Sequence, residues 1–235
     1  MLDNKTILVI VPARGGSKGV ILKNIRKLNG IPLTGLAGKV VQELSWVDRA
    51  VVSTDHTEIA KIAVEYGLEA PFVRSEELSR DTIGDVDVLT EALLLLENLD
   101  GRVYDIIVML QPTSPFRTSK HVSDAVKLLL DSNADSVWTI SLSDSKAHPY
   151  KQLLIKNNEV EFYDPAGDKI IARQQLFPTY HKNGVAYVMT RDCLVNQNSI
   201  RGNICKPLII EDFVVNIDTE IDLAFADFYL NQQNT

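Results

Sequence analysis

The chain has 235 residues, of which 45% are hydrophobic and 23% are charged, and its formal net charge at pH 7 is -7. This length and apolar content predict one large α/β domain with a sizeable core. The acidic balance argues against nucleic acid or an anionic membrane as a partner, and no apolar run is long enough for a transmembrane helix. The N-terminus lacks a cleavable signal and the two cysteines lack metal-site spacing, so we expect a reducing, cytoplasmic location.

The first predicted strand leads into a basic loop. Residues 7–11 form a continuous apolar run, as expected for a strand that is covered on both faces. No Asp or Glu occurs from residue 4 to residue 42, although the chain as a whole is acidic. The cations of this segment are Lys5, Arg14, Lys18, Lys23, Arg26, Lys27 and Lys39. An acid-free basic segment of this kind indicates a binding site for a compact polyanion.

Three glycines strengthen that interpretation. Gly15, Gly16 and Gly19 let the backbone approach a ligand closely and point its N–H groups at phosphate oxygens. Their spacing matches neither the P-loop pattern nor the dinucleotide fingerprint. The loop therefore predicts phosphate binding of another kind, and the alternative is a solvated loop whose charge is incidental.

Beyond this loop, predicted helices and strands alternate. Helices are expected at residues 32–46, 57–66, 85–99 and 119–131, and strands at 49–53, 70–73, 105–110 and 136–141. Asp55 is predicted to cap the second helix with Glu58 in a capping box, and Thr118 or Ser119 to cap the last. This spacing is typical of right-handed βαβ units with a mainly parallel sheet.

The pattern changes after residue 141. Short strands are predicted at residues 152–155, 160–163, 169–172 and 185–190, interrupted by turn residues at 157–158 and 165–168. The chain then returns to the main body with strands at 207–210 and 213–217 and a final helix at 219–230.

Polar loops follow three of the predicted strands. The basic loop follows the first strand, residues 110–117 follow the strand at 105–110, and Asp218 follows the strand at 213–217. In open α/β sheets, ligands bind beyond the carboxyl ends of the strands. We therefore expect these three loops to meet at one site.

Four motifs carry a resemblance to a known family. They are VPARGGSKGVILKNIRKLNGIPL at residues 11–33, RSEELSRD at 74–81, LQPTSPFR at 110–117 and IDTEID at 217–222, with HPYK at 148–151 and RQQLFP at 173–178 in addition. In this order, the motifs resemble those of the CMP-sialic acid synthetases, the acylneuraminate cytidylyltransferases. The resemblance extends from about residue 7 to about residue 230.

The resemblance implies a Rossmann-like, three-layer nucleotidyltransferase fold with a mainly parallel sheet. Residues 1–235 would form a single domain, with residues 142–190 as an inserted antiparallel arm through which two copies form a homodimer. The implied reaction joins CTP and N-acylneuraminate, a nine-carbon 2-keto sugar acid, to give the CMP-sugar and diphosphate. Residues of the arm would complete the active site of the partner subunit.

The resemblance also assigns the nucleotide site. Arg14 and Lys23 would be catalytic residues that bind the triphosphate, and Lys23 would neutralise charge as diphosphate leaves. Gly15, Asn24 and Arg74 would complete the nucleotide contacts. The alternatives are a solvated lysine at position 23 and, at position 74, a surface ion pair with a nearby glutamate.

Five residues are assigned in the same way to the sugar acid. Gln111 and Thr113 offer an amide and a hydroxyl to a polyol, although the prolines beside them also fit an ordinary turn. Lys151, Arg173 and Tyr187 match residues of the arm that reach the sugar carboxylate, for which an Arg side chain is well suited. Taken alone, Tyr187 is better explained as a core aromatic residue on a strand.

The metal candidate is Asp218, which the resemblance makes a catalytic ligand of Mg²⁺. Many members of the family carry a second acidic ligand where this chain has Asn216, whose amide oxygen is neutral. Mg²⁺ is typically held by one or two carboxylates together with substrate phosphates and water. The alternative is purely local, because Thr219 and Asp222 form a capping-box pattern at the start of the final helix.

Two further interpretations compete with the first. One is the same reaction on legionaminic, pseudaminic or 3-deoxy-manno-octulosonic acid. The other is a non-catalytic nucleotide-sugar binding protein on the same fold, for which Asn216 is the main argument.

Overall fold

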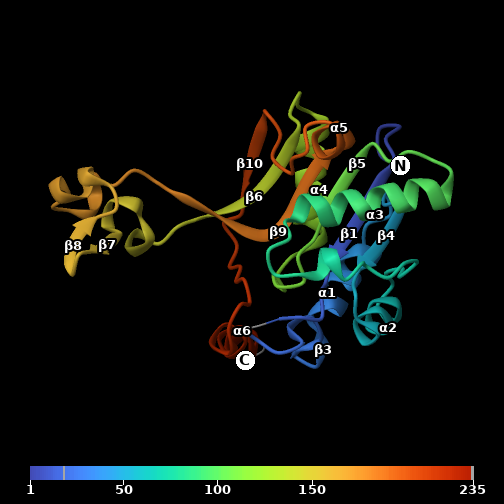
Figure 1. Cartoon of the computed structure of the whole chain (residues 1–235), viewed down its shortest axis with the longest axis horizontal. Helices are drawn as coiled ribbons and strands as arrows, with labels where there is room; N and C mark the ends of the chain where they lie inside the picture. Colours follow the sequence, from blue (N-terminus) through green and yellow to red (C-terminus); the bar gives the residue numbers. More distant parts are fainter. Residues whose placement is uncertain (18, 234–235) are drawn as a thin grey trace. The chain divides into compact units, whose positions relative to one another are not determined.

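The computed structural model describes residues 1–17 and 19–233, so Lys18 of the basic segment lies outside the described residues. The chain divides into two compact units (Figure 1). The main unit comprises Met1–Thr139 and the chain from Asn183 onward, and the small unit comprises Ile140–Lys182. Within the described ranges, no helix combines the length and the hydropathy that crossing a membrane requires.

A six-stranded sheet in the order β10-β6-β9-β5-β1-β4 is the centre of the fold. The strands are β1 (Ile7–Pro12), β4 (Arg49–Ser53), β5 (Ile106–Met109), β6 (Ser136–Leu142), β9 (Tyr180–Thr190) and β10 (Cys205–Ile209). Strand β1 pairs in parallel with both β4 and β5, with Ile10 opposite Val51 and Met109. Strand β9 runs antiparallel to β5, with Tyr187 opposite Met109. The predicted α/β class with a mainly parallel sheet is confirmed.

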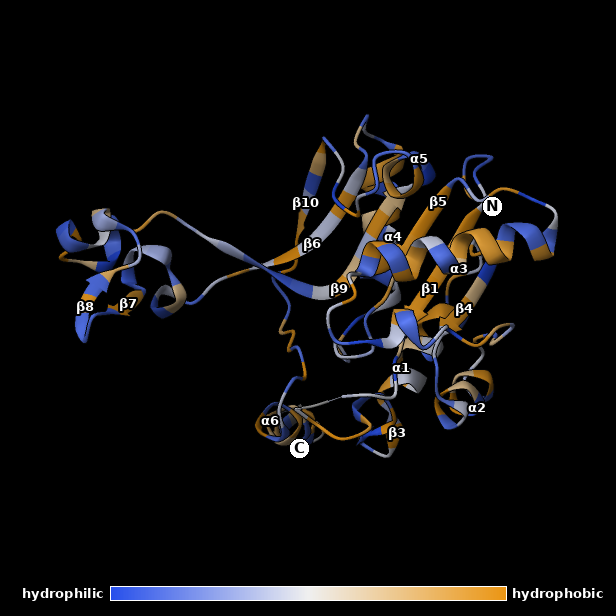
Figure 2. Ribbon diagram, in the orientation of Figure 1, coloured by the Kyte–Doolittle hydropathy of each residue, from blue (hydrophilic) through white to orange (hydrophobic). Residues whose placement is uncertain are grey.

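Helices cover both faces of this sheet. On one face lie α1 (Leu33–Gln42), α2 (Thr57–Glu65) and α4 (Ser119–Leu130), and on the other lie α3 (Asp85–Asp100) and α5 (Arg191–Val195). Successive side chains of a strand point to opposite faces. Accordingly, Ile7, Val9 and Val11 of β1 are buried against the first group of helices, and Leu8 and Ile10 against the second. Figure 2 shows the mainly hydrophobic strands β1, β4 and β5 with helices of mixed hydropathy around them.

A smaller cluster joins the two ends of the chain. The hairpin of β2 (Lys27–Leu28) and β3 (Ile31–Pro32) turns through Asn29 and Gly30, which both have positive φ, as a type I′ turn requires. Helix α6 (Glu220–Gln233) packs against this region. The buried members of the cluster are Leu28, Leu33, Ile217, Leu223 and Ala226. This packing brings the segment that carries Asp218 to the loop that follows β1.

The small unit contains a hairpin of β7 (Leu153–Lys156) and β8 (Glu159–Phe162). Its turn residues, Asn157 and Asn158, both have positive φ, as predicted for a turn at this point. Four short 3-10 helices accompany the hairpin: η3 (Ser145–Ala147), η4 (Pro149–Lys151), η5 (Pro165–Lys169) and η6 (Arg173–Gln175). The rings of His148, Tyr150 and Phe177 meet edge to face, and of the three His148 is buried.

Several predicted strands are absent from the described residues. The stretch at 70–73 forms no strand. An isolated bridge between Glu69 and Val51 immediately precedes it, and Pro71 has no N–H to donate to a strand ladder. The stretch at 169–172 follows the 3-10 helix that Asp164 caps. The stretch at 213–217 is a loop that hydrogen-bonds to another loop, from Ile217 N to Thr113 O at 2.8 Å. None of the three stretches pairs along a neighbouring strand, and Ile217 alone among their residues is buried.

Three further differences concern boundaries. Residues 183–190, expected in the arm, belong to β9 of the main sheet, and the separate unit is Ile140–Lys182. Helix α2 is capped by His56, whose Nδ1 accepts from Glu58 N, because Asp55 accepts from Gly15 N instead. Helix α4 is capped by Thr118 as predicted, and His121 completes the capping box. The first helix, α1, ends at Gln42 rather than at residue 46.

Candidate active site

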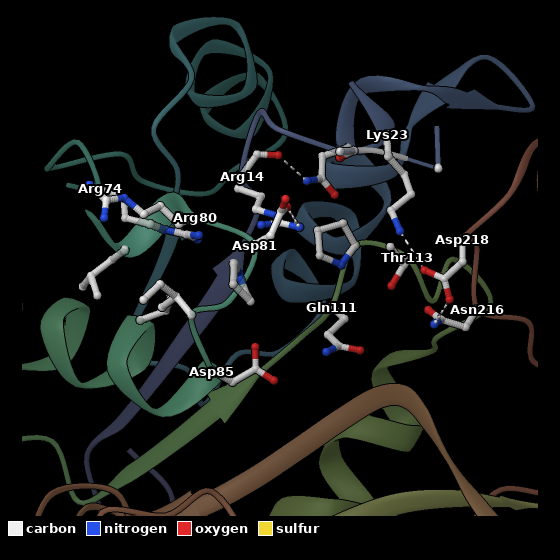
Figure 3. Close-up of a pocket in the computed structure, with 18 residues that line it drawn as sticks. Arg14, Lys23, Arg74, Arg80, Asp81, Asp85, Gln111, Thr113, Asn216 and Asp218 are labelled. Carbon is white, nitrogen blue, oxygen red and sulfur yellow. Dashed lines mark hydrogen bonds and ion pairs between the residues drawn. The ribbon is translucent and has the colours of Figure 1, made fainter. Parts of the chain in front are cut away.

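A polar cavity of about 460 Å³ lies where the loops after β1 and β5 meet the 216–218 segment (Figure 3). The lining residues come from these three loops and from the stretch between residues 74 and 88. Those on the three loops are Pro12, Arg14, Ser17, Gly19, Lys23, Asn24, Gln111, Pro112, Thr113, Asn216 and Asp218. The three loops that were expected to converge therefore do so around one cavity.

Backbone contacts hold these loops together. A Cβ added at Gly19 would lie 2.4 Å from the carbonyl oxygen of Asp218, so only glycine permits this approach of the two chains. Ile217 N donates to Thr113 O at 2.8 Å and ties the 216–218 segment to the loop after β5. The relative placement of the lining side chains is thus set by main-chain contacts.

Arg14 lies in the cavity and forms an ion pair with Asp81 at 2.9 Å. Behind it, the amide of the buried Asn24 donates to Arg14 O at 2.9 Å. Thr34 in turn donates its hydroxyl to Asn24 O at 2.8 Å. Asn24 therefore fixes the backbone that presents the Arg14 guanidinium, in addition to lining the cavity.

Lys23 and Asp218 form the second ion pair of the cavity, with Nζ 2.8 Å from Oδ1. The Lys23 side chain is only 17% exposed, whereas that of Asp218 is 64% exposed. Asn216 Nδ2 donates to the other carboxylate oxygen at 2.9 Å. Figure 3 shows the three side chains together at one end of the cavity.

Gly15 and Arg74 have support roles in the structure. The Gly15 N–H donates to Asp55 Oδ1 at 2.8 Å, and a Cβ at this position would press on the His56 ring. Arg74 is 4% exposed and donates to the hydroxyl and carbonyl oxygens of Ser53, so it is not the surface ion pair considered as an alternative. Burial lowers the pKa of Arg74, and the nearby Asp55 carboxylate opposes this effect.

Gln111 and Thr113 line the cavity from the loop after β5, as Figure 3 shows. Arg117, at the end of the same motif, is a buried residue, only 5% exposed. Its guanidinium donates to main-chain carbonyl groups of the same loop and of β9.

The remaining predicted sugar contacts are not among the residues that line this cavity. Lys151 and Arg173 belong to the small unit, where Arg173 and His148 line a separate cavity of about 200 Å³. Tyr187 is buried in β9, where its ring meets Trp138 edge to face. Its hydroxyl accepts from Gly184 N at 3.2 Å, and burial raises its pKa. Tyr187 is thus a core aromatic residue on a strand, the explanation that its sequence context favoured.

The capping box predicted at the start of the last helix is present, but it does not use the side chain of Asp218. The Asp222 carboxylate accepts from Thr219 N at 2.7 Å, and Asp222 N donates to Thr219 Oγ1 at 3.2 Å. Burial raises the pKa of Asp222, but hydrogen bonds from the Asp218 and Thr219 N–H groups outweigh it and leave the pKa below its ordinary value. Asp222 caps α6, which leaves the Asp218 carboxylate directed at the cavity.

Metal binding at this position would rest on few protein ligands. Across residues 1–17 and 19–233, no group of three or more His, Cys, Asp or Glu side chains is arranged to hold a metal ion. One exposed carboxylate, Asp218, with the amide of Asn216 beside it, fits the way Mg²⁺ is held when substrate phosphates supply further ligands. The residues present therefore suit a metal ion that binds together with the nucleotide.

Three charged lining residues were not singled out from the sequence. Arg80 and Asp81 end the RSEELSRD motif, from which only Arg74 was selected, and Asp85 is the first residue of α3. The available signal was the motif itself, but a motif that contains one cavity residue marks its neighbours as cavity residues only if their side chains point to the same side of the loop. That orientation is not encoded in the spacing of the residues.

Comparison with known proteins identifies the family. A family model described as cytidylyltransferase matches residues 8–227. The chain is 32% identical over 240 residues to the CMP-N,N'-diacetyllegionaminic acid synthase of Legionella pneumophila, covering 97% of this chain and 98% of that protein. It is 36% identical over 232 residues to N-acylneuraminate cytidylyltransferase A of Danio rerio, covering 95% of this chain and 50% of that protein. The chain belongs to the cytidylyltransferase family.

The fold of this cytidylyltransferase is also found among solved structures. A CMP:2-keto-3-deoxy-manno-octonic acid synthetase complexed with CTP superposes with a TM-score of 0.73 at 16% identity, covering 97% of this chain and 99% of the other. The protein is therefore a nucleotidyltransferase of the cytidylyltransferase family. Its family generally uses a divalent metal ion.

Proposed function

We propose that this cytidylyltransferase acts on an N-acylneuraminate, converting it with CTP to the CMP-sugar and diphosphate. The observation that carries the proposal is the placement of Arg14 and Lys23 in one cavity with Asp218 and Gln111. Cations beside a carboxylate suit a triphosphate with its metal ion, and the amide suits a polyol. The 36% identity to the N-acylneuraminate enzyme of Danio rerio supports this choice of sugar.

The chemistry asks for positioning and charge neutralisation more than for covalent help from the protein. The anomeric hydroxyl oxygen of the sugar acid forms a bond to the α-phosphorus of CTP, its proton passes to solvent water, and the bond between the α-phosphorus and the departing diphosphate breaks. Arg14 and Lys23 bind the phosphates and neutralise the charge that grows on diphosphate. Mg²⁺, held by Asp218 with Asn216, would supply Lewis-acid stabilisation of the same phosphates.

A second candidate is the same reaction on N,N'-diacetyllegionaminic acid. The Legionella pneumophila relative favours it, because that alignment covers 98% of the relative, whereas the Danio rerio alignment covers half. A pseudaminic acid cytidylyltransferase of Campylobacter jejuni is 29% identical over 222 residues, and the solved fold relative acts on 3-deoxy-manno-octonic acid, so both acids belong in the test.

We also propose that the protein is a homodimer whose small unit, residues 140–182, serves the site of the partner. A two-stranded hairpin alone is marginally stable in water. The hairpin of β7 and β8 nevertheless leaves large apolar side chains exposed, among them Ile155 at 79% and, elsewhere in the unit, Ile171 at 94%. A second subunit would cover these side chains, and Lys151 and Arg173 would then reach the carboxylate of the sugar acid that the partner binds.

The test is diphosphate release from CTP with Mg²⁺ against a panel of N-acetylneuraminic, legionaminic, pseudaminic and 3-deoxy-manno-octulosonic acids. We expect diphosphate release with N-acetylneuraminic acid and no release when EDTA is present. Lys23→Met should lower kcat by about 100-fold. Release only with another acid would replace the proposed substrate. If the protein binds CTP but releases no diphosphate with any acid of the panel, it is a nucleotide-binding protein. Asn216→Asp would then be the first variant to test for activity.

A further inference from the structure

The guanidinium of Arg117 is buried in a nest of main-chain carbonyl groups. Nη2 donates to Gln111 O at 2.7 Å and to Gly184 O at 2.9 Å, and Nε donates to Val185 O. Hydrogen bonds from a charged donor are stronger than those from a neutral one, and only the Arg fork presents several donors in fixed directions. Arg117 therefore joins the loop that follows β5 to the first residues of β9 that lie in the main unit.

Gly184 forms the other half of this contact. It has a φ of +71°, and a Cβ there would lie 2.4 Å from Ser114 Oγ and 2.7 Å from Gln111 Oε1. Ser114 Oγ donates to Asn183 O at 2.7 Å, and Gly184 N donates to the hydroxyl of Tyr187. Glycine is required here for both its backbone conformation and the space that it leaves.

Together these contacts hold Gln111 from two sides. Its main-chain carbonyl is bound by Arg117, and its side-chain oxygen occupies the space that a Cβ on Gly184 would need. Gln111 itself lines the cavity. We propose that Arg117 and Gly184 are positioning residues that fix the Gln111 amide for the sugar acid, a role that rests on the proposed function of the cavity.

The positioning role explains why the charged side chain of Arg117 is buried against the main chain of β9. Desolvation lowers the pKa of Arg117 to about 9, which leaves the guanidinium charged at neutral pH. Charge makes its hydrogen bonds to three carbonyl groups stronger than those of a neutral donor. Because a small displacement of a binding group weakens its contacts with a substrate, rigid support behind Gln111 should raise the affinity for the sugar acid.

The first test compares Arg117→Lys and Gly184→Ala with the wild type in steady-state kinetics. We expect KM for the sugar acid to rise by about 10-fold and KM for CTP to change by less than about twofold, since only the Gln111 side of the cavity is disturbed. In a Gln111→Ala background, Arg117→Lys should raise KM for the sugar acid by less than a further factor of about two, because the side-chain amide that Arg117 positions is gone. Equal effects on both KM values, or a full effect in the Gln111→Ala background, would overturn the proposal.

Arg191→Lys is the matched control for loss of a partly buried Arg. Arg191 pairs with Glu97 at 2.8 Å and does not line the cavity. The Arg191→Lys variant should therefore have the same kcat and KM values as the wild type. Thermal unfolding of each variant separates kinetic effects from loss of fold. If Arg117→Lys does not fold, Gly184→Ala supplies the same comparison.

A second readout does not depend on turnover. In the NMR spectrum of the wild type, the side-chain NH₂ signals of Gln111, assigned by their loss in Gln111→Ala, should be well separated from those of exposed glutamines. In Arg117→Lys they should move toward the exposed positions. Unchanged signals would contradict the positioning role even if no acid of the panel were a substrate, so its failure is distinguishable from failure of the proposed function.

Discussion

At the scale of single residues, the cavity pairs each of its phosphate-binding candidates with a carboxylate. Arg14 pairs with Asp81 and Lys23 pairs with Asp218. Under the proposed function, such pairs would hold the cations in place for the triphosphate, while the carboxylates would compete with phosphate for them. Partly exposed pairs contribute only about 0.2–1 kcal/mol, so we expect this competition to be modest.

Asp81→Asn should tighten CTP binding by about two- to fivefold, the equivalent of a partly exposed ion pair. The substitution removes a competitor for Arg14 and also a negative charge that repels the triphosphate, and both effects act in the same direction. Isothermal titration calorimetry with CTP measures the change directly.

Arg14→Met provides the comparison for that experiment. It should weaken CTP binding, and in the Arg14→Met background the gain from Asp81→Asn should shrink, since the competition for Arg14 is gone. Weaker CTP binding in Asp81→Asn alone would mean that Asp81 acts chiefly by orienting Arg14.

At the scale of elements, the site depends on close approach of the loop after β1 to the 216–218 segment. Gly19→Ala would place a Cβ 2.4 Å from the main-chain oxygen of Asp218, and a backbone atom cannot move aside as a side-chain tip can. The loop must then shift away from Asp218, so we expect kcat to fall by at least about 10-fold. Because Gly19 is exposed, the midpoint of urea unfolding should change little.

Gly16→Ala is the matched control in the same loop, because a Cβ at this position meets no atom within 4 Å. Its effect on kcat should be clearly smaller than that of Gly19→Ala. Equal losses in the two variants would show that the loop needs flexible glycines in general rather than the contact with Asp218.

The same scale shows how far the sequence predicts the fold. Period and apolar content predicted β1, α3, α4 and the hairpin turn at Asn157 and Asn158, because those signals are local. The apolar runs at 70–73 and 213–217 look the same in the sequence, but a strand also needs an adjacent partner. Helix α5, with five residues, is too short for a periodic signal and was not predicted.

At the scale of the whole molecule, the convergence of three distant loops on one cavity was predicted from topology alone. The roles of the individual side chains in that cavity could not be predicted in this way. Nothing in the sequence indicated that Arg117 is buried, because two of the three carbonyl groups that it binds belong to a strand almost 70 positions away. Asp81 and Asp85 gave no separate signal, since an exposed carboxylate and a cavity carboxylate have the same local sequence. Motifs therefore indicate which loops form the site, but tertiary contacts decide what each side chain does.

Contacts between distant segments also govern the response of the molecule to acid. Hydrogen bonds from Arg191 hold the pKa of Glu97 below its ordinary value and join α3 to α5. The Ile204 N–H holds the pKa of Asp135 below its ordinary value in the same way. A carboxyl group with a lower pKa in the folded state adds stability above its unfolded pKa of about 4, and this contribution is lost as pH falls through the folded pKa.

The free energy of unfolding should therefore change little between pH 7 and pH 6 as far as these groups are concerned, and should fall steadily below about pH 4.5. Glu97→Gln should lower it by about 1–3 kcal/mol at pH 7, because Arg191 loses its charged acceptor. This difference from the wild type should narrow as pH approaches 3, where the wild-type carboxylate is also becoming protonated. Urea unfolding at a series of pH values measures the free energy of unfolding of the wild type and of Glu97→Gln. Glu65→Gln, on the exposed surface of α2, is the control for removing one negative charge. A Glu97→Gln difference that stayed constant down to pH 3 would show that the side chain stabilises the fold through packing, and that the ion pair with Arg191 adds nothing.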